Sequence, residues 1–524
     1  MGKTYLLDCT LRDGGYINDW AFGEEAIHGT IRKLEKTGIE FIEIGFLKGD
    51  TYDPAHSLFP DTESCKRVLA NKQKHVTYVA MADLSAPLPL ERYRPRDEHG
   101  IDGVRVIFKK SKLEAAYDYC KAIKALGYEL FVNFVSTDQY SDKEFIEGLE
   151  KFNALQPTGV TIVDTFGMIK RKHFLRLAAL ADNNLDPGIA LCYHAHNNLQ
   201  QAFGNAEALV DMNLSRDVCI DACVFGMGRG AGNLNLELFA GYMNDNYGTN
   251  YRIAPMLEIM DEYLSGFYRT RFWGYSLPLY LSASHGCHPN YAIYLAEKNT
   301  LSEKAFNELL QQISPEDKGI FNKDKAEQYY RAYLENFVDD KAALQALTAE
   351  LKDKTVLLLA PGKTLASCEG TVRAALAAQD TVVMTVNFYD ERFAPDYVFC
   401  SNLRRYGKFP AGAPTRLVVS SNIKEPEKAD YVVNFSTYVS RHAEIVDNSG
   451  LMALRLLEAV GVREVRIAGM DGFSETPDEN FYDQELVSDH VATATLRNSL
   501  ISEDLSEIRR HISLEFLTPT HYNV

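Results

Sequence analysis

Apolar runs alternate with amphipathic, helix-patterned segments through about the first 240 residues of this 524-residue chain. The runs recur roughly every 25–40 residues, the repeat length of a strand followed by a helix. Eight runs are predicted as strands: Tyr5–Cys9, Phe41–Phe46, Val76–Met81, Val104–Phe108, Leu130–Val135, Val160–Val163, Ile189–Tyr193 and Val218–Val224. Ser111 is the predicted N-cap of a helix that ends at Ala125. Eight βα units in about 250 residues are typical of a (β/α)8 TIM barrel, and a doubly wound open sheet is the alternative.

Beyond this barrel the pattern changes twice. Apolar positions at helical spacing fill Ile253–Phe267, Glu303–Gln312 and Asp324–Phe337. From Thr355 onward, strand and helix patterns alternate again, which predicts a Rossmann-like, three-layer α/β domain with a mostly parallel sheet. The predicted domains are residues 1–245 for the barrel, 246–350 for a helical extension and 351–524 for the Rossmann-like domain.

Composition narrows the class of protein. The 55 basic and 72 acidic residues give a formal charge of −17, and an acidic surface repels phosphate backbones, so we expect no nucleic-acid partner. The nine cysteines are scattered without a Cys-x-x-Cys pair, which predicts buried thiols in a reducing compartment. No signal-peptide pattern opens the chain, and no apolar run reaches membrane length. We therefore expect a cytoplasmic homo-oligomer without a membrane span.

His194 and His196 close an apolar run, and this spacing predicts a metal site. In a strand, residues i and i+2 project from the same face, so both imidazoles can reach one cation. Asp13, after the first strand, adds a carboxylate, and Asn233 in a glycine-rich loop after the eighth strand offers a fourth ligand. This oxygen and nitrogen set suits Mn²⁺ or Mg²⁺ first, with Fe²⁺, Co²⁺ or Zn²⁺ as alternatives. The alternative interpretation is two polar residues at a strand end.

Arg12 precedes the metal-ligand candidate Asp13 directly. A guanidinium beside a metal stabilises the negative charge that develops on an enolate oxygen, which indicates chemistry at the carbon next to a carbonyl. Glu43 interrupts an apolar strand, and a carboxylate inside a barrel needs a partner. Arg12 is the obvious partner, so Glu43 is predicted to orient it. A surface ion pair is the alternative role for Arg12.

Four motifs carry a family resemblance: Asp8-Cys-Thr-Leu-Arg-Asp-Gly14, Ile42-Glu-Ile-Gly45, His194-Ala-His-Asn197 and Gly226-Met-Gly-Arg-Gly-Ala-Gly-Asn233. Together they resemble the HMG-CoA-lyase-like, pyruvate carboxyltransferase-type superfamily of metal-dependent enzymes, and most closely its 4-hydroxy-2-oxovalerate aldolase branch. The resemblance implies that Asp13, His194 and His196 are metal ligands, with Asn233 as a fourth. It also implies that Arg12 stabilises a pyruvate-like enolate.

The chain departs from each branch of this superfamily. The synthases resemble Arg-Asp-Gly-Glu-Gln, where this chain has Gly15 and Tyr16 in the last two places. The aldolase branch places its general-base histidine three residues after the metal aspartate, at the position of Tyr16. The base is therefore open: Tyr16 serves if the metal or Arg12 depresses its pKa. His285, His288 and Tyr291 are rival catalytic candidates, with helix capping and packing as their alternative role.

The C-terminal domain more loosely resembles Rossmann-like domains of sialyltransferase-type glycan-pathway proteins. The likeness depends on Ala360-Pro-Gly-Lys-Thr364, Asp396-Tyr-Val-Phe-Cys-Ser-Asn402 and Ser449-Gly-Leu-Met-Ala453. It implies binding of a nucleotide or nucleotide-sugar. Backbone amides at the turn and helix start after Pro361 and Gly362 are predicted to hold a phosphate. The other predicted binding residues are Asn402, Ser449 and Asp471. The alternative is a scaffold or oligomerisation module.

These observations predict a divalent-metal-dependent carbon–carbon lyase, an aldolase that acts on a 2-oxo acid and an aldehyde. The second domain favours a surface-glycan or nucleotide-linked pathway. One alternative is an acyl-CoA-dependent Claisen synthase of the isopropylmalate or homocitrate type. Another is a non-catalytic nucleotide-binding protein with a decayed barrel.

Overall fold

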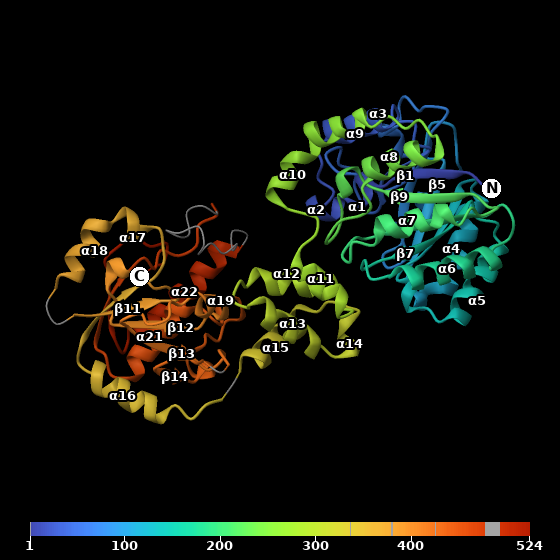
Figure 1. Ribbon diagram of the computed structural model, residues 1–524. Coiled ribbons are helices and arrows are strands. Elements are labelled where there is room, and N and C mark those ends of the chain that lie inside the picture. Colours follow the sequence, from blue (N-terminus) through green and yellow to red (C-terminus); the bar gives the residue numbers. More distant parts are fainter. Residues whose placement is uncertain (1, 336, 379–380, 425, 477–492, 524) are drawn as a thin grey trace. The chain divides into compact units, whose positions relative to one another are not determined.

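The structure is a computed structural model that describes residues 2–335, 337–378, 381–424, 426–476 and 493–523. The chain divides into two compact units, Met1–Pro289 and Asn290–Val524. The first unit contains a closed barrel and the second a separate parallel sheet (Figure 1). The predicted limits of three domains stay a prediction.

Eight parallel strands close the barrel of the first unit. They are β1 (Thr4–Asp8), β2 (Phe41–Leu47), β4 (Thr77–Asp83), β5 (Gly103–Phe108), β6 (Glu129–Phe134), β7 (Gly159–Asp164), β8 (Ala190–Ala195) and β9 (Val218–Ala222). β1 pairs with β9 on one side and β2 on the other, which completes the ring. The short β3 (Leu58–Phe59) adds to β2 outside it. The predicted barrel is confirmed, and the open sheet is excluded.

Helices follow six of these strands. They are α1 (Thr10–Asp13), α2 (Gly15–Asn18) and α3 (Glu24–Leu34) after β1, then α4 (Leu113–Ala125), α5 (Asp142–Asn153), α6 (Arg171–Asn184), α7 (Ala202–Asp211) and α8 (Leu236–Tyr247). After β2 and β4 the chain forms only the short 3₁₀ turns Ser64–Val68 and Leu90–Arg92. The prediction that Ser111 caps α4 is wrong, because Lys110–Lys112 form a 3₁₀ turn and α4 begins at Leu113.

The barrel interior changes from apolar to charged toward the carboxyl ends of the strands. Leu7, Val79, Phe131, Cys192 and Cys219 form a buried apolar cluster. Charged and polar side chains are also buried there: Glu43 and Arg105 pair in register with Val79 and Phe131, and His194 and Asp221 lie two residues beyond Cys192 and Cys219. Strand alternation explains this layer, because the flanking residues, such as Val104 and Val106, belong to the core between barrel and helices. The fold therefore places charged groups directly below the barrel mouth.

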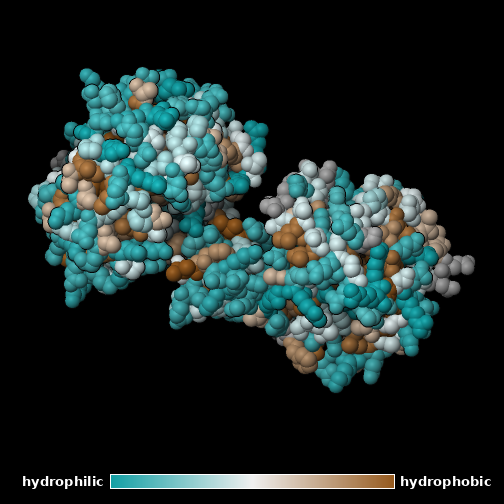
Figure 2. All heavy atoms as spheres, turned by 180° about the vertical axis from the view of Figure 1, so that it is seen from behind, coloured by the Kyte–Doolittle hydropathy of each residue, from teal (hydrophilic) through white to brown (hydrophobic). Residues whose placement is uncertain are grey.

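A helical segment follows the barrel. Its helices are α9 (Ala254–Ile259), α10 (Ser265–Thr270), α11 (Leu277–Ser284), α12 (Pro289–Glu297), α13 (Glu303–Gln312), α14 (Pro315–Lys318), α15 (Lys323–Leu334) and α16 (Lys341–Leu351). A π-helical turn, Met260–Leu264, joins α9 to α10. No helix among the described residues is long and apolar enough to cross a membrane. Figure 2 shows a mostly hydrophilic surface on both units, with separate hydrophobic patches.

The second unit is built on a parallel sheet. Its strands are β10 (Thr355–Leu359), β11 (Thr381–Val386), β12 (Tyr397–Cys400), β13 (Arg416–Ser420), β14 (Tyr431–Val433), β15 (Glu464–Ala468) and β16 (Ser513–Phe516), in the order β14-β13-β12-β11-β10-β15-β16. The remaining helices are α17 (Thr364–Ser367), α18 (Glu369–Leu376), α19 (Leu403–Gly407), α20 (Phe435–Tyr438), α21 (Ser449–Ala459) and α22 (Ala494–Ile508). The strand order reverses at β10, which lies between β11 and β15. The predicted second α/β sheet is confirmed.

Candidate active site

Three of the predicted metal ligands meet at the barrel mouth. Asp13 ends α1, His194 lies in β8, and His196 follows that strand directly. His194 Nε2 is 3.3 Å from Asp13 Oδ2, and His196 Nε2 is 3.4 Å from Asp13 Oδ1. All three side chains are buried, and their ligand atoms lie within 4.8 Å of one another. The barrel thus brings together two imidazoles and a carboxylate that are about 180 residues apart in sequence.

Asn233, the fourth predicted ligand, lies beside the same cluster. A β-bridge pairs it with His196. Its Nδ2 donates to the carbonyl of Met227 at 3.2 Å, and this bond fixes the orientation of the side-chain amide. A Cβ at Gly228 would lie 2.1 Å from Asn233 Nδ2 and 3.0 Å from Asp13 Oδ1. Position 228 therefore requires glycine, because any side chain would displace these two candidate ligands.

Three polar atoms in this cluster have no partner with hydrogen-bond geometry among the described residues: Asp13 Oδ1 and His196 Nε2, which face each other at 3.4 Å, and Asn233 Oδ1. Leaving such an atom buried and unsatisfied costs about 1–3 kcal/mol. One carboxylate oxygen, one imidazole nitrogen and one amide oxygen are suitable donors for a divalent cation. The residues present therefore fit the metal that the sequence predicts.

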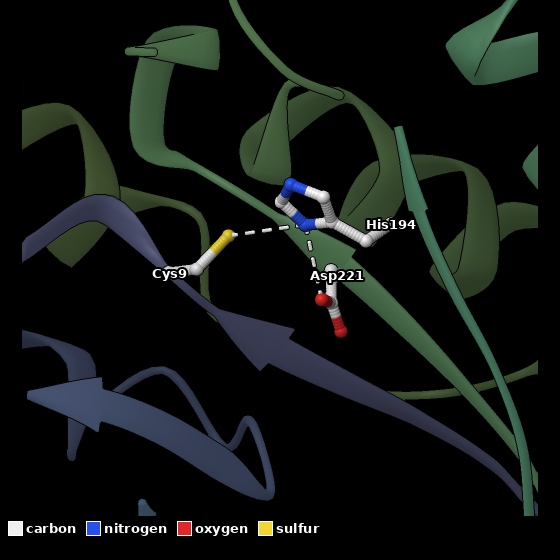
Figure 3. Close-up of side chains that lie close together, drawn as sticks. All are labelled: Cys9, His194 and Asp221. Atoms are coloured by element: carbon white, nitrogen blue, oxygen red, sulfur yellow. Dashed lines mark hydrogen bonds and ion pairs between the residues drawn. The ribbon is translucent and has the colours of Figure 1, made fainter. Parts of the chain in front are cut away.

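His194 is held from behind by Asp221, which the sequence analysis missed. Asp221 Oδ2 lies 3.0 Å from His194 Nδ1, and Cys9 Sγ lies 4.0 Å from the same nitrogen (Figure 3). The carboxylate fixes the imidazole so that Nε2 faces Asp13, the usual second contact of a metal-ligating histidine. Burial alone would lower the pKa of His194, but Asp13 and Asp221 hold it well above its usual value. A cation bound here must displace that proton.

Arg12 is a buried cation between two acids. Its Nε donates to Glu43 Oε2 at 2.7 Å, which is the predicted contact, and its Nη1 donates to Asp13. Burial alone would lower its pKa, but Glu43 and Asp13 raise it well above the usual value. Burial alone would raise the pKa of Asp13, but Arg12 and the imidazole of His196 hold it well below the usual range. Both side chains are therefore charged at neutral pH.

Tyr16 lies at the mouth beside charges of both signs, and it is 39% exposed. The Arg229 guanidinium lies 5.6 Å from the centre of its ring. Loss of hydration and the charge of Asp13 raise the pKa of Tyr16, whereas Arg12 and Arg229 lower it. Arg12 therefore acts in the predicted direction but does not reverse the net rise, and the catalytic role of Tyr16 stays a prediction.

His288 joins the same mouth. His288 Nε2 lies 3.1 Å from Arg229 Nη2, and its ring packs edge-on against Phe166. Burial, Arg229 and Lys109 lower the pKa of His288 to about 3. A neutral imidazole with so low a pKa is a weak base. His285 ends α11, where its backbone N–H bonds to the carbonyl of Leu281, which is the capping role.

Tyr291 belongs to the second unit and has a packing environment. Its side chain is fully buried. The hydroxyl donates to the carbonyls of Asp317 and Ile320, and the ring packs edge-on against Phe321. These contacts favour the packing role that was the alternative for Tyr291, and its catalytic role stays a prediction.

The predicted phosphate turn of the second unit is hydrogen-bonded within the protein itself. Gly362 N donates to the carbonyl of Gly469 at 2.8 Å, and Thr364 N donates to Asp471 Oδ2 at 2.8 Å. The Thr364 hydroxyl donates to the other oxygen of Asp471. These bonds use the backbone N–H groups of Gly362 and Thr364, and the phosphate role predicted for Pro361 and Gly362 stays a prediction.

Asn402 and Ser449 are also engaged within their own unit. Asn402 Oδ1 accepts from the backbone of Arg404 and Arg405 and so caps α19. Ser449 Oγ is 2.7 Å from Ser401 Oγ and accepts from Asn387 Nδ2 at 2.5 Å. The structure brings these residues to the carboxyl ends of β11 and β12, but it satisfies their polar atoms from within.

Comparisons with known proteins concern the barrel. Residues 103–259 match the model of the HMGL-like family. The 4-hydroxy-2-oxovalerate aldolase of Roseiflexus castenholzii is 27% identical over 270 residues, which is 50% of this chain and 76% of that protein. That of Moorella thermoacetica is 24% identical over 264 residues, 49% of this chain and 75% of that protein.

A solved structure shares the fold. The N-terminal domain of a "putative aldolase" from Bacteroides vulgatus aligns with a TM-score of 0.50 at 23% identity, and covers 59% of this chain and 100% of that domain. The family-model match and the aldolase relatives support, for the barrel, the superfamily indicated by the four motifs, and the solved structure supports its fold. The resemblance of the C-terminal domain stays a prediction.

Proposed function

We propose that the barrel is a divalent-metal-dependent carbon–carbon lyase, an aldolase that acts on a 2-oxo acid and an aldehyde. The observation that carries this proposal is the contact between Arg12 and Asp13. It places a permanently charged guanidinium against a ligand cluster whose buried acceptor atoms lack partners. Aldolases among the relatives support the same reaction class.

Different residues of the chain are proposed to have different roles in the reaction. Asp13, His194, His196 and Asn233 would hold the cation, which supplies Lewis-acid polarisation of the 2-oxo acid carbonyl. Arg12, fixed by Glu43, donates to the oxygen on which enolate charge develops. Tyr16, at the mouth, is proposed to take the proton of the aldol hydroxyl. Its pKa is raised by loss of hydration and by Asp13, so this role requires that positive charge at the site, such as that of Arg12 and Arg229, lowers the pKa.

The direct test follows the methyl protons of pyruvate in D₂O by NMR. We expect exchange that requires Mn²⁺ or Mg²⁺ and falls at least about 100-fold in Arg12→Ala, since an oxyanion donor is worth about 10²–10³ in rate. Arg92→Ala, which removes an exposed arginine paired with Asp50, is the matched control and should exchange normally. Absence of exchange with Mn²⁺, Mg²⁺, Co²⁺ and Zn²⁺ would contradict the proposal.

The two alternative functions give different results in the same samples. A Claisen synthase would release free thiol from acetyl-CoA in the presence of a 2-oxo acid, and Gly15 and Tyr16 disfavour this branch. A decayed barrel would bind no divalent cation, and Asp13→Asn would leave its properties unchanged. Saturable Mn²⁺ binding that Asp13→Asn abolishes excludes the decayed barrel.

For the second unit we propose nucleotide or nucleotide-sugar binding at the carboxyl edge of its sheet. The supporting observation is the reversal of strand order at β10, because open parallel sheets bind ligands where the order reverses. The test is equilibrium dialysis of the whole protein with a nucleoside diphosphate sugar. Saturable binding supports the proposal, and absence of binding favours a scaffold or oligomerisation module.

A further inference from the structure

Arg105 is a buried cation in the barrel wall that the sequence analysis did not select. It lies in β5, where the flanking residues of Gly103–Phe108 are mostly apolar, and its side chain is 1% exposed. Its Nη1 lies 3.2 Å from Glu43 Oε2, and its Nη2 donates to Asp221 Oδ2. One guanidinium therefore contacts two acids that come from opposite ends of the barrel sequence.

Each of these acids orients one group of the proposed reaction. Asp221 holds the metal-ligand candidate His194 through Nδ1 at 3.0 Å. Glu43 holds Arg12 through Nε at 2.7 Å. Arg12 and His194 both reach Asp13, so the contacts close into a ring. In order, the members of this ring are Arg12, Glu43, Arg105, Asp221, His194 and Asp13.

We propose that Arg105 is a positioning residue that fixes the positions of Arg12 and His194 relative to each other. This inference rests on the proposed function. Two acids in a buried interior need a shared partner, and the guanidinium of Arg105 lies between them. The rigid guanidinium donates a hydrogen bond to Asp221 through Nη2 and forms an ion pair with Glu43 through Nη1, so its planar shape sets the spacing between the acids, which the ammonium of lysine cannot do. The enolate-binding cation and the metal ligand are thereby supported by the same side chain.

The ring of contacts predicts a result that neutralisation of charge alone does not predict. If Arg105 only neutralises the charge of the two acids, Arg105→Lys should behave as the wild-type protein does. If the fork positions both acids, Arg105→Lys is impaired in two measurements that depend on different branches of the ring. Asp221→Asn should affect mainly metal affinity, and Glu43→Gln mainly enolisation. Arg105 variants should affect both.

The experiment measures Mn²⁺ dissociation by electron paramagnetic resonance of the free ion, and pyruvate methyl exchange at saturating Mn²⁺. For Arg105→Met we expect a dissociation constant raised about 10–100-fold, the usual effect of losing a support behind a metal ligand, and slower exchange as well. Arg105→Lys should be impaired in both, by a smaller factor. The matched control is Arg216→Met, because Arg216 is also a buried arginine, paired with Asp182 and with carbonyls of the α6–β8 connection. It should leave both measurements unchanged.

The outcomes separate the two proposals. Wild-type Mn²⁺ affinity and exchange in Arg105→Lys would overturn the positioning role, because a point charge would then suffice. If Arg105→Met does not fold, Arg105→Met with Glu43→Gln removes one charge of each sign and is measured against Glu43→Gln alone. Equal Mn²⁺ affinity in those two proteins also overturns the inference. Failure of the wild-type protein to bind Mn²⁺ or to exchange pyruvate protons would instead overturn the proposed function, and this inference with it.

Discussion

The carboxyl ends of the strands carry buried polar side chains in both units, but the two sets are satisfied differently. At the barrel mouth, Asp13 Oδ1, His196 Nε2 and Asn233 Oδ1 find no hydrogen-bond partner among the described residues. At the edge of the second sheet, Asp471 accepts from Thr364 and Asn402 caps α19. Both sets were selected from sequence by the same rule, position after a parallel strand. The unsatisfied atoms at the barrel mouth support a ligand site there, whereas the residues selected in the second unit already have structural partners, so a ligand at that edge would have to displace them or use other atoms.

The largest effect expected from this comparison is on metal affinity. His196→Gln should weaken Mn²⁺ binding at least about 100-fold, since it removes a direct ligand. The metal-free protein should change its free energy of unfolding by only about 1–3 kcal/mol, because the ring contacts the carbonyl of Asp164 at 3.3 Å and the carboxylate of Asp13 at 3.4 Å. His173→Gln is the matched control, since His173 also has a buried, unpartnered Nε2 but lies on α6. An equal loss of affinity in that control would contradict the assignment.

Asp8 allows the same comparison within the barrel. It is a buried acid whose hydrogen-bond partners are supplied by the protein itself. It accepts from the hydroxyl and backbone N–H of Thr10, and burial raises its pKa to about 7, against 3.8 ordinarily. The folded state therefore holds this proton more tightly than the unfolded state. Its contribution to stability is complete below about pH 4 and is lost as the pH rises to about 7, by at most about 4 kcal/mol.

Asp8→Asn should remove this pH dependence and raise the free energy of unfolding above pH 7. Both tryptophans, Trp20 and Trp273, lie in the first unit, so urea unfolding followed by tryptophan fluorescence reports on the barrel. Mn²⁺ affinity should stay at the wild-type value. Parallel pH profiles for the variant and the wild-type protein would contradict the raised pKa.

Asp471→Ala tests the second unit, where the protein itself satisfies the polar side chains at the edge of the sheet. Removing the carboxylate leaves the N–H and hydroxyl of Thr364 without their acceptor, at a cost of about 1–3 kcal/mol in the second unit. We expect faster hydrogen exchange in the peptide that contains Thr364, measured by mass spectrometry. Tryptophan fluorescence and Mn²⁺ affinity should not change. Unaltered hydrogen exchange would show that Asp471 is not the structural acceptor.

The smallest effect is expected at Asn402. Asn402→Ala removes the N-cap of α19 and should cost about 1 kcal/mol, seen as faster exchange over Leu403–Gly407. Asn402→Asp keeps a capping oxygen and should restore protection. If the aspartate variant restored protection but lost nucleotide-sugar binding, Asn402 would also be a binding residue. If alanine left exchange unchanged, the capping role would be wrong.

Sequence reasoning succeeded where one local signal sufficed. The recurring apolar runs predicted the barrel, and the His-x-His spacing predicted two imidazoles on one face of β8. Glu43 was found because an acid interrupts an apolar strand. Arg105 and Asp221 interrupt β5 and β9 in the same way, so the signal was present but was not applied to them.

Other predictions needed contacts that no local signal contains. Tyr291 and His285 were chosen from a short motif, but Tyr291 donates to the carbonyls of Asp317 and Ile320 within the helical core. The turn at Gly362 has the composition of a phosphate site. Asp471, more than a hundred residues later, accepts from the backbone of Thr364 at this turn. In each case the partner that the structure supplies is distant in sequence.

The sequence by itself determined the barrel, the parallel second sheet, and the chemistry of Asp13, Arg12 and the two histidines. It did so because strand period and residue type are local properties. Only the tertiary structure decided that Arg105 and Asp221 complete a ring behind those residues, and that the second sheet satisfies its own polar edge. Both outcomes depend on which strands become neighbours when the barrel closes and the sheet order reverses. The partners of a buried charge are set by that closure.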